Sequence, residues 1–91
     1  MKYLICYDIS GDKNRRRVAR FLESCAYRLQ YSVFVASCSS LQIEAIKEKI
    51  FGIIGNTGNS ILTIIPLCHS CEEKIWQYGE PVETPVPYVI A

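Results

Sequence analysis

A carboxylate and a run of arginines lie close together near the start of the sequence. Asp8 ends an apolar stretch, and Lys13, Arg15, Arg16 and Arg17 follow within the first turns of a predicted helix. The dipole of a helix disfavours cations at its N-terminus and favours anions there. Guanidinium groups beside free helix N–H groups are suited to binding phosphate. This position favours an anionic partner over the alternative, a charged helix face that contacts only solvent.

Asp8 is also a candidate metal ligand. Mg²⁺ is commonly bound through one or two carboxylates, with water molecules completing its shell. The alternative is an aspartate that caps a turn, and one carboxylate by itself is a weak metal site. In a two-fold dimer the same residue occurs twice, so that two carboxylates can face one ion. The metal hypothesis therefore depends on dimer symmetry.

A second cluster occupies residues 68–71, with the sequence CHSC. This spacing is that of half a zinc site, but no second pair follows at a ligand spacing. Ordinary thiols at a strand-to-helix junction are the favoured alternative, and metal binding by Cys68 and Cys71 stays open. Tyr31 and Phe34 have the residue types that stack on RNA bases. The glycine-aromatic signature of RNA-recognition modules and the glycine-rich phosphate loops are both absent.

The chain is nearly neutral, but its charge is unevenly distributed. Its length of 91 residues limits it to one domain. Ten basic and nine acidic residues exclude a histone-like polycation. Residues 1–40 hold seven of the basic and three of the acidic side chains, so we expect a basic binding surface in this half. Five cysteines, with no signal-peptide pattern and no apolar run of bilayer length, favour a cytoplasmic protein with reduced thiols.

The hydrophobic patterning predicts alternating strands and helices. Residues 2–8 predict a strand, 12–27 a helix capped by Asp12, and 29–37 either one kinked strand or a tight hairpin. Ser39 and Gln42 have the spacing of a capping box and begin a second helix. A buried strand over 60–65 is expected to end at Pro66, followed by a helical turn over 68–73 and a short strand over 74–78.

This order predicts an α+β fold of the ferredoxin-like, split βαβ type, with an antiparallel sheet and two helices on one face. Residues 1–79 would form the domain, and 80–91 a proline-containing tail that forms an edge strand. The first strand is apolar on both faces, and two helices cover only one of them. The simplest cover for the other face is a second copy of the chain, so we expect a homodimer.

An ordered set of segments resembles the CRISPR-associated protein Cas2 family, the small adaptation proteins of prokaryotic immunity. The matching segments are YLICYDIS (3–10), RRRVA (15–19), RLQYSVF (28–34), residues 39–47, IPLC (65–68) and Cys71. The resemblance implies a ferredoxin-like homodimer whose C-terminal strand often joins the sheet of the partner. It also implies a metal-dependent endonuclease acting on single-stranded RNA or double-stranded DNA, and the central dimer of the spacer-integration complex, held between dimers of the CRISPR integrase Cas1.

The same resemblance assigns roles to individual residues. The family's metal-binding aspartate corresponds to Asp8, with Mg²⁺ or Mn²⁺ as the implied ion, and Tyr7 is its catalytic neighbour. Arg15 and Arg28 match basic positions linked to activity, and Phe34 matches a supporting aromatic. Arg16 and Arg17 lie in the same basic stretch, and all four arginines are predicted to bind nucleic acid.

Two departures from the family pattern concern the strength of nuclease activity. Val35 follows Phe34 where many relatives have an acidic residue, and Gly11 interrupts a turn that is often more acidic. The alternatives are a non-catalytic DNA-binding scaffold in spacer acquisition, a related ferredoxin-like ribonuclease toxin, and a generic RNA-binding module.

Overall fold

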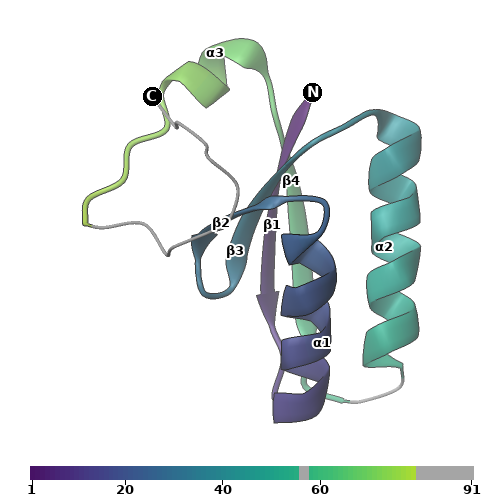
Figure 1. Ribbon diagram of the computed structural model, residues 1–91. Helices are drawn as coiled ribbons and strands as arrows, with labels where there is room; N and C mark the ends of the chain where they lie inside the picture. The colour runs from purple at the N-terminus through teal and green to yellow at the C-terminus, as the bar shows by residue number, and fades with distance from the viewer. Residues whose placement is uncertain (56–57, 80–91) are drawn as a thin grey trace.

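The computed structural model describes residues 1–55 and 58–79 and contains four strands and three helices within them (Figure 1). In chain order the elements are β1 (Lys2–Asp8), α1 (Asp12–Glu23), β2 (Tyr27–Gln30), β3 (Val33–Ser37), α2 (Ser40–Ile54), β4 (Ile61–Leu67) and α3 (His69–Glu73). None of the described helices is long and apolar enough to cross a membrane.

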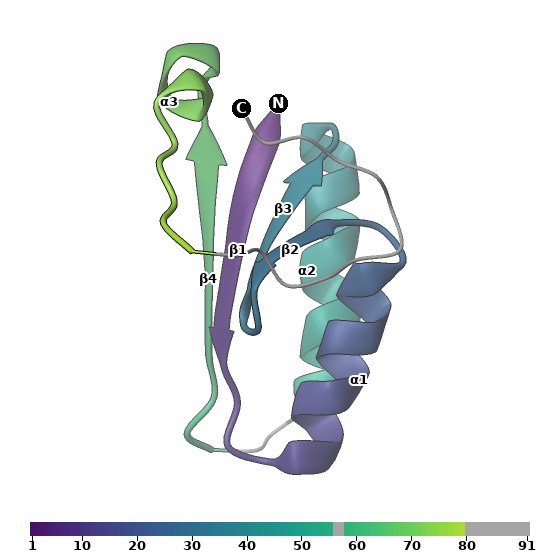
Figure 2. The same cartoon turned by 60° about the vertical axis from the view of Figure 1, so that its left-hand side comes forward.

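The four strands form one antiparallel sheet in the order β2-β3-β1-β4. Helices α1 and α2 lie side by side against one face of this sheet (Figures 1 and 2). The inward side chains of β1 and β3 are buried beneath these helices, and Ile5 and Phe34 are fully buried there together with Val18, Leu22 and Ile50. This architecture confirms the predicted ferredoxin-like α+β fold.

Helix α1 is shorter than the sequence predicts. It ends at Glu23 rather than near residue 27, and Gly11 rather than Asp12 is the N-cap, with no side-chain hydrogen bond to the first turn. The helical pattern fails at its end because Tyr27 and Arg28 pair with Val35 and Phe34 of β3. Strand pairing with a distant segment therefore overrides local helix propensity.

The β-rich stretch is a hairpin rather than one kinked strand. Tyr31 and Ser32 form the turn between β2 and β3, and the register shifts between Arg28 and Gln30. Such a bulge places two residues of one strand opposite one residue of its partner. The hairpin end is tied to β1 by a hydrogen bond from the Tyr7 amide to the Ser32 carbonyl, at 3.1 Å.

Helix α2 confirms its predicted capping box. The Ser39 hydroxyl accepts from the Gln42 amide at 3.1 Å, and the Gln42 side chain accepts from the Ser39 amide at 2.8 Å. Both bonds satisfy N–H groups that the first helical turn leaves free. The buried face of α2 then consists of isoleucines at helical spacing: Ile43, Ile46, Ile50 and Ile54.

Strand β4 differs from its prediction in length and in burial. It continues through Pro66 to Leu67, which an edge strand permits because one row of its N–H groups has no partner strand. Ile61 is 61% exposed and Ile65 42% exposed, so the strand is not buried within one chain. Pairing opposite Asp8 and Leu4 places both isoleucines on the sheet face away from the helices.

The segment after α3 also differs from its prediction. Helix α3 confirms the helical turn, but residues 74–78 form no strand. Trp76 and Tyr78 are almost fully exposed and stack on each other, with ring centroids 6.4 Å apart. The strand and partner pairing predicted for the tail, 80–91, lie outside the described residues.

Two leucines, one buried and one exposed, test which helix positions pack in the core. Replacing Leu22, which is fully buried, with Ala should lower the free energy of unfolding by about 2–5 kcal/mol. Leu41→Ala on α2, where the side chain is 83% exposed, should change it by no more than about 0.5 kcal/mol. Urea denaturation of both variants tests this arrangement, and equal losses would contradict it.

Candidate nucleic-acid interface

Asp8 is the last residue of β1, and its side chain is exposed. It pairs with Ile61 and alternates with Tyr7, so it belongs to the sheet face that the helices leave uncovered. Carboxylate oxygen is the ligand type that Mg²⁺ prefers. Within the described residues, no group of three His, Cys, Asp or Glu side chains is placed to hold a metal ion. Asp8 is therefore a single exposed carboxylate at the end of β1.

Tyr7 points the other way, into the core. Its ring stacks against Phe34 with centroids 6.2 Å apart, and its hydroxyl donates to the Tyr31 carbonyl at 3.1 Å. Burial raises the pKa of Tyr7, while the positive charge of Arg28 opposes the rise. The phenol is therefore a neutral donor at pH 7. This location suits positioning of the end of β1 better than contact with a phosphate.

Arg28 lies on the inner face of β2, with its side chain only 16% exposed. Its guanidinium stands over the rings of Phe34 and Tyr31, at 5.0 and 5.8 Å from their centroids. The same group pairs with Glu23 at the end of α1, at 3.4 Å. Cation–π contacts and an ion pair are the ways in which proteins accommodate a partly buried arginine. Arg28 thus differs in exposure from the arginines of α1, which are exposed.

The exposed basic surface is the first half of α1. Arg15 pairs with Asp12 and donates to the Ile9 carbonyl at 3.2 Å, which fixes it beside the start of the helix. Arg16 and Arg17 are exposed and have no ion-pair partner among the residues that the structure describes. Because no side chain caps the first turn, its N–H groups add to the attraction for an anion.

Asp8 and this basic surface lie at the same end of the molecule. Figure 2 shows the end of β1 and the start of α1 together, joined by a short turn. Ile9 in that turn is buried, which anchors the connection. The carboxylate faces the open side of the sheet, whereas the arginines follow a helix on the covered side. The sequence thus located both groups correctly but gave no indication of this separation.

The CHSC motif lies at the opposite end of the sheet, at the start of α3 (Figure 1). Cys68 caps α3 by accepting the Cys71 amide, at 3.4 Å from nitrogen to sulfur. His69 pairs with Glu73 at 2.9 Å, so its ring is already engaged on the same helix. The described part of the chain provides no third ligand for a metal here. The motif is therefore separate from the site at Asp8.

The ion-pair partner of Arg28 was not predicted from the sequence. Glu23 fixes Arg28 by the ion pair, but the patterning placed it within a longer helix rather than at the end of α1. Acidic and basic residues five positions apart have no preferred contact on a continuous helix. Only a correct prediction of where the helix ends would have indicated this ion pair.

The fold and the basic end of α1 together define a small ferredoxin-like protein with an exposed surface suited to phosphates. The family model for "CRISPR associated protein Cas2" matches residues 1–75. The chain belongs to the CRISPR-associated Cas2 family.

Relatives in this family are similar over most of the chain. A CRISPR-associated endoribonuclease Cas2 of Rhodospirillum rubrum is 37% identical over 92 residues, covering 98% of this chain and 73% of the relative. One from Chloroflexus aurantiacus is 36% identical and covers 92% of each chain. The crystal structure of Streptococcus pyogenes Cas2 has a TM-score of 0.77 and 25% identity, covering 87% of this chain and all of the other.

The hydrogen bond of the Tyr7 hydroxyl, which holds the end of β1 to the hairpin turn, can be tested directly. Tyr7→Phe removes its hydrogen bond to the Tyr31 carbonyl and should lower the free energy of unfolding by about 1 kcal/mol. Tyr31→Phe is the matched control, because the backbone carbonyl and the exposed ring both persist. Urea denaturation compares the two, and an equal or larger effect of Tyr31→Phe would contradict the assignment.

Proposed function

We propose that this chain is a metal-dependent endonuclease of CRISPR adaptation that cleaves RNA as a homodimer. The single observation that carries the proposal is the exposed Asp8 at the same end as the uncapped, arginine-rich start of α1. A carboxylate suited to a divalent ion beside a phosphate-binding surface is the combination that phosphodiester hydrolysis requires. The relatives' name, endoribonuclease, supports RNA as the substrate.

The uncovered face of the sheet supports the dimer. Ile61 and Ile65 are exposed there, and Leu4, Cys6 and Leu67 on the same face are only half-buried. Contiguous apolar surface of this kind usually marks an interface. A two-fold contact over this face would bury it and would bring together the two copies of Asp8. Dimerisation would thus complete the half-site of a single chain.

In this mechanism the Asp8 carboxylates of the two protomers would hold Mg²⁺ or Mn²⁺. A bound divalent ion supplies polarisation of the phosphodiester and a nucleophilic water at neutral pH. Arg15, Arg16 and Arg17 bind flanking phosphates without reading base sequence. Tyr7, stacked on Phe34 and bonded to the hairpin turn, keeps the end of β1 in place while the substrate binds.

Removal of the Asp8 charge tests the catalytic part of the proposal. Asp8→Asn preserves side-chain size but removes the carboxylate, so metal-dependent cleavage of a labelled single-stranded RNA should fall by about 100-fold or more. Dimer mass by light scattering and RNA affinity should be unchanged. Cleavage by the purified variant at the wild-type rate and with the same metal dependence would overturn the assignment.

A second candidate function is that of a non-catalytic scaffold that holds spacer DNA between dimers of the integrase Cas1. The observation that favours it is the lone carboxylate, with no group of three metal ligands in the described chain. A spacer-integration assay with Cas1 and Asp8→Asn separates the two functions. A scaffold keeps integrating spacers and shows no metal-dependent RNA cleavage even as the wild-type protein.

The arginines of α1 should control affinity rather than base preference. Arg16→Ala and Arg17→Ala should each weaken binding to all sequences alike and reduce the slope of log K against log salt by about 1 for each phosphate that the variant no longer neutralises. Lys49→Ala, an exposed cation on α2, is the control. Fluorescence anisotropy at several salt concentrations measures both quantities, and an unchanged slope in the arginine variants would contradict the assignment.

A further inference from the structure

We infer that Cys68 and Cys71 form a redox-active dithiol, which closes reversibly to an intramolecular disulfide by exchange with a low-molecular-weight disulfide. Neither the family's name nor the proposed nuclease accounts for this pair. The dithiol lies at the opposite end of the sheet from Asp8, so the inference is independent of the proposed function.

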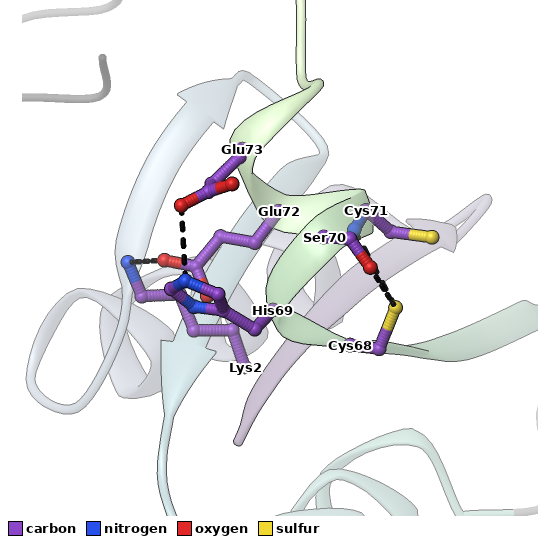
Figure 3. Close-up of polar contacts among 7 residues, drawn as sticks. All are labelled: Lys2, Cys68, His69, Ser70, Cys71, Glu72 and Glu73. Atoms are coloured by element: carbon purple, nitrogen blue, oxygen red, sulfur yellow. Dashed lines mark hydrogen bonds and ion pairs between the residues drawn. The ribbon is translucent and has the colours of Figure 1, made fainter.

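The geometry of the pair is set by the first turn of α3. The Cys68 sulfur accepts the Cys71 amide at 3.4 Å and contacts the Ser70 hydroxyl at 3.6 Å (Figure 3). Both cysteines are exposed, so an external disulfide can reach them. The two thiols are also close enough to interact electrostatically with each other. Proximity and access are the two conditions for exchange.

The electrostatics give the two thiols different roles. Hydrogen bonds from the Ser70 hydroxyl and from the amide and thiol of Cys71 lower the pKa of Cys68 to about 7. A thiol whose pKa lies near the ambient pH is the most effective attacking group in thiol–disulfide exchange. The neighbouring Cys68 raises the pKa of Cys71, so Cys71 keeps its proton until Cys68 has reacted. Cys68 is the attacking thiol and Cys71 the resolving thiol.

Four charged or ionisable side chains beside the two cysteines pair with one another. His69 pairs with Glu73 at 2.9 Å along α3, and Lys2 of β1 pairs with Glu72 at 2.6 Å (Figure 3). The charges of Lys2 and Glu72 oppose each other, and so do those of His69 and Glu73 when the imidazole is protonated. The hydrogen bonds to the sulfur are therefore the main stabilisation of the Cys68 thiolate.

The other three cysteines are chemically different. Desolvation raises the pKa of Cys6, Cys25 and Cys38. Cys25 is exposed as a residue, but its thiol donates to the Phe21 carbonyl at 3.6 Å and stays protonated. The sequence contains no other pair of cysteines spaced as C-x-x-C. The chain thus has one activated thiol with a resolving partner, and three thiols of low reactivity.

Closure must bring the two cysteine Cβ atoms to within about 3.5–4.5 Å of each other. Cys68 is the N-cap of α3, with extended backbone angles φ −72° and ψ 165°, and its carbonyl accepts the Glu72 amide at 2.9 Å. Because this bond holds the Cys68 backbone, closure proceeds by rotation of the two side chains. When the disulfide forms, it takes the place of the hydrogen bond from the Cys71 amide to the Cys68 sulfur.

The exchange is balanced in atoms and electrons. The Cys68 thiolate attacks one sulfur of the external disulfide, forming a mixed disulfide and releasing one thiolate. Cys71 then loses its proton and attacks the Cys68 sulfur, which forms the intramolecular bond and releases the second thiolate. Two electrons pass from the dithiol to the external disulfide, and the two protons of the cysteines end on the two released thiols.

The test uses the full chain in buffers of reduced and oxidised glutathione with a chelator present. Intact mass spectrometry of the wild-type protein should show the loss of two hydrogens, and peptide mapping should place the bond between Cys68 and Cys71. Cys71→Ser should stop at a glutathione adduct on Cys68, and Cys68→Ser should form neither product at a comparable rate. Cys25→Ser, the matched control, should close like the wild type.

Alkylation by iodoacetamide across pH gives a second readout that needs no disulfide. The rate at Cys68 should rise with a midpoint near pH 7, and Ser70→Ala should move that midpoint upward. A stable glutathione adduct on the wild-type protein, disulfides formed only between chains, or equal alkylation rates at Cys25 and Cys68 would each overturn the inference. Stoichiometric Zn²⁺ retained by the pair, without the chelator, would replace it with a metal site.

Discussion

The structure depends on the central strand β1, which packs one face against both helices and leaves the other open. Its strict alternation sends Ile5 and Tyr7 into the core and Cys6 and Asp8 to the uncovered face. A shift of one residue would reverse every one of these assignments. The buried core therefore fixes not only stability but also which carboxylate is available to a metal ion, and on which side of the sheet it lies.

The buried contacts of Arg28 divide the basic residues into two groups. Arg28 stacks on Phe34 and pairs with Glu23, which joins the β2–β3 hairpin to the end of α1. Its Nε atom is buried with no hydrogen-bond partner among the described residues, so this contact has an unrecovered desolvation cost. Arg16 and Arg17 are instead exposed on α1, where no ion-pair partner among the described residues competes with an anion for them.

Local patterns predicted most of the fold, whereas contacts between distant segments caused the errors. The strand over 2–8 and the capping box of Ser39 depend on neighbouring residues and were both confirmed. The end of α1 and the passage of β4 through Pro66 depend on strand pairing and edge position, which spacing alone does not encode. The same distinction holds in the site: Asp8 and the α1 arginines could be located, but the burial of Arg28 could not.

The length of β1 sets the distance between the proposed metal site and the proposed dithiol. Lys2 at its start pairs with Glu72 beside the dithiol, while Asp8 ends the strand. Six residue steps at about 3.3 Å each separate them by about 20 Å. Coulomb interaction across that distance is largely screened at physiological salt. Oxidation of the proposed dithiol is therefore expected to leave the electrostatics at Asp8 unchanged.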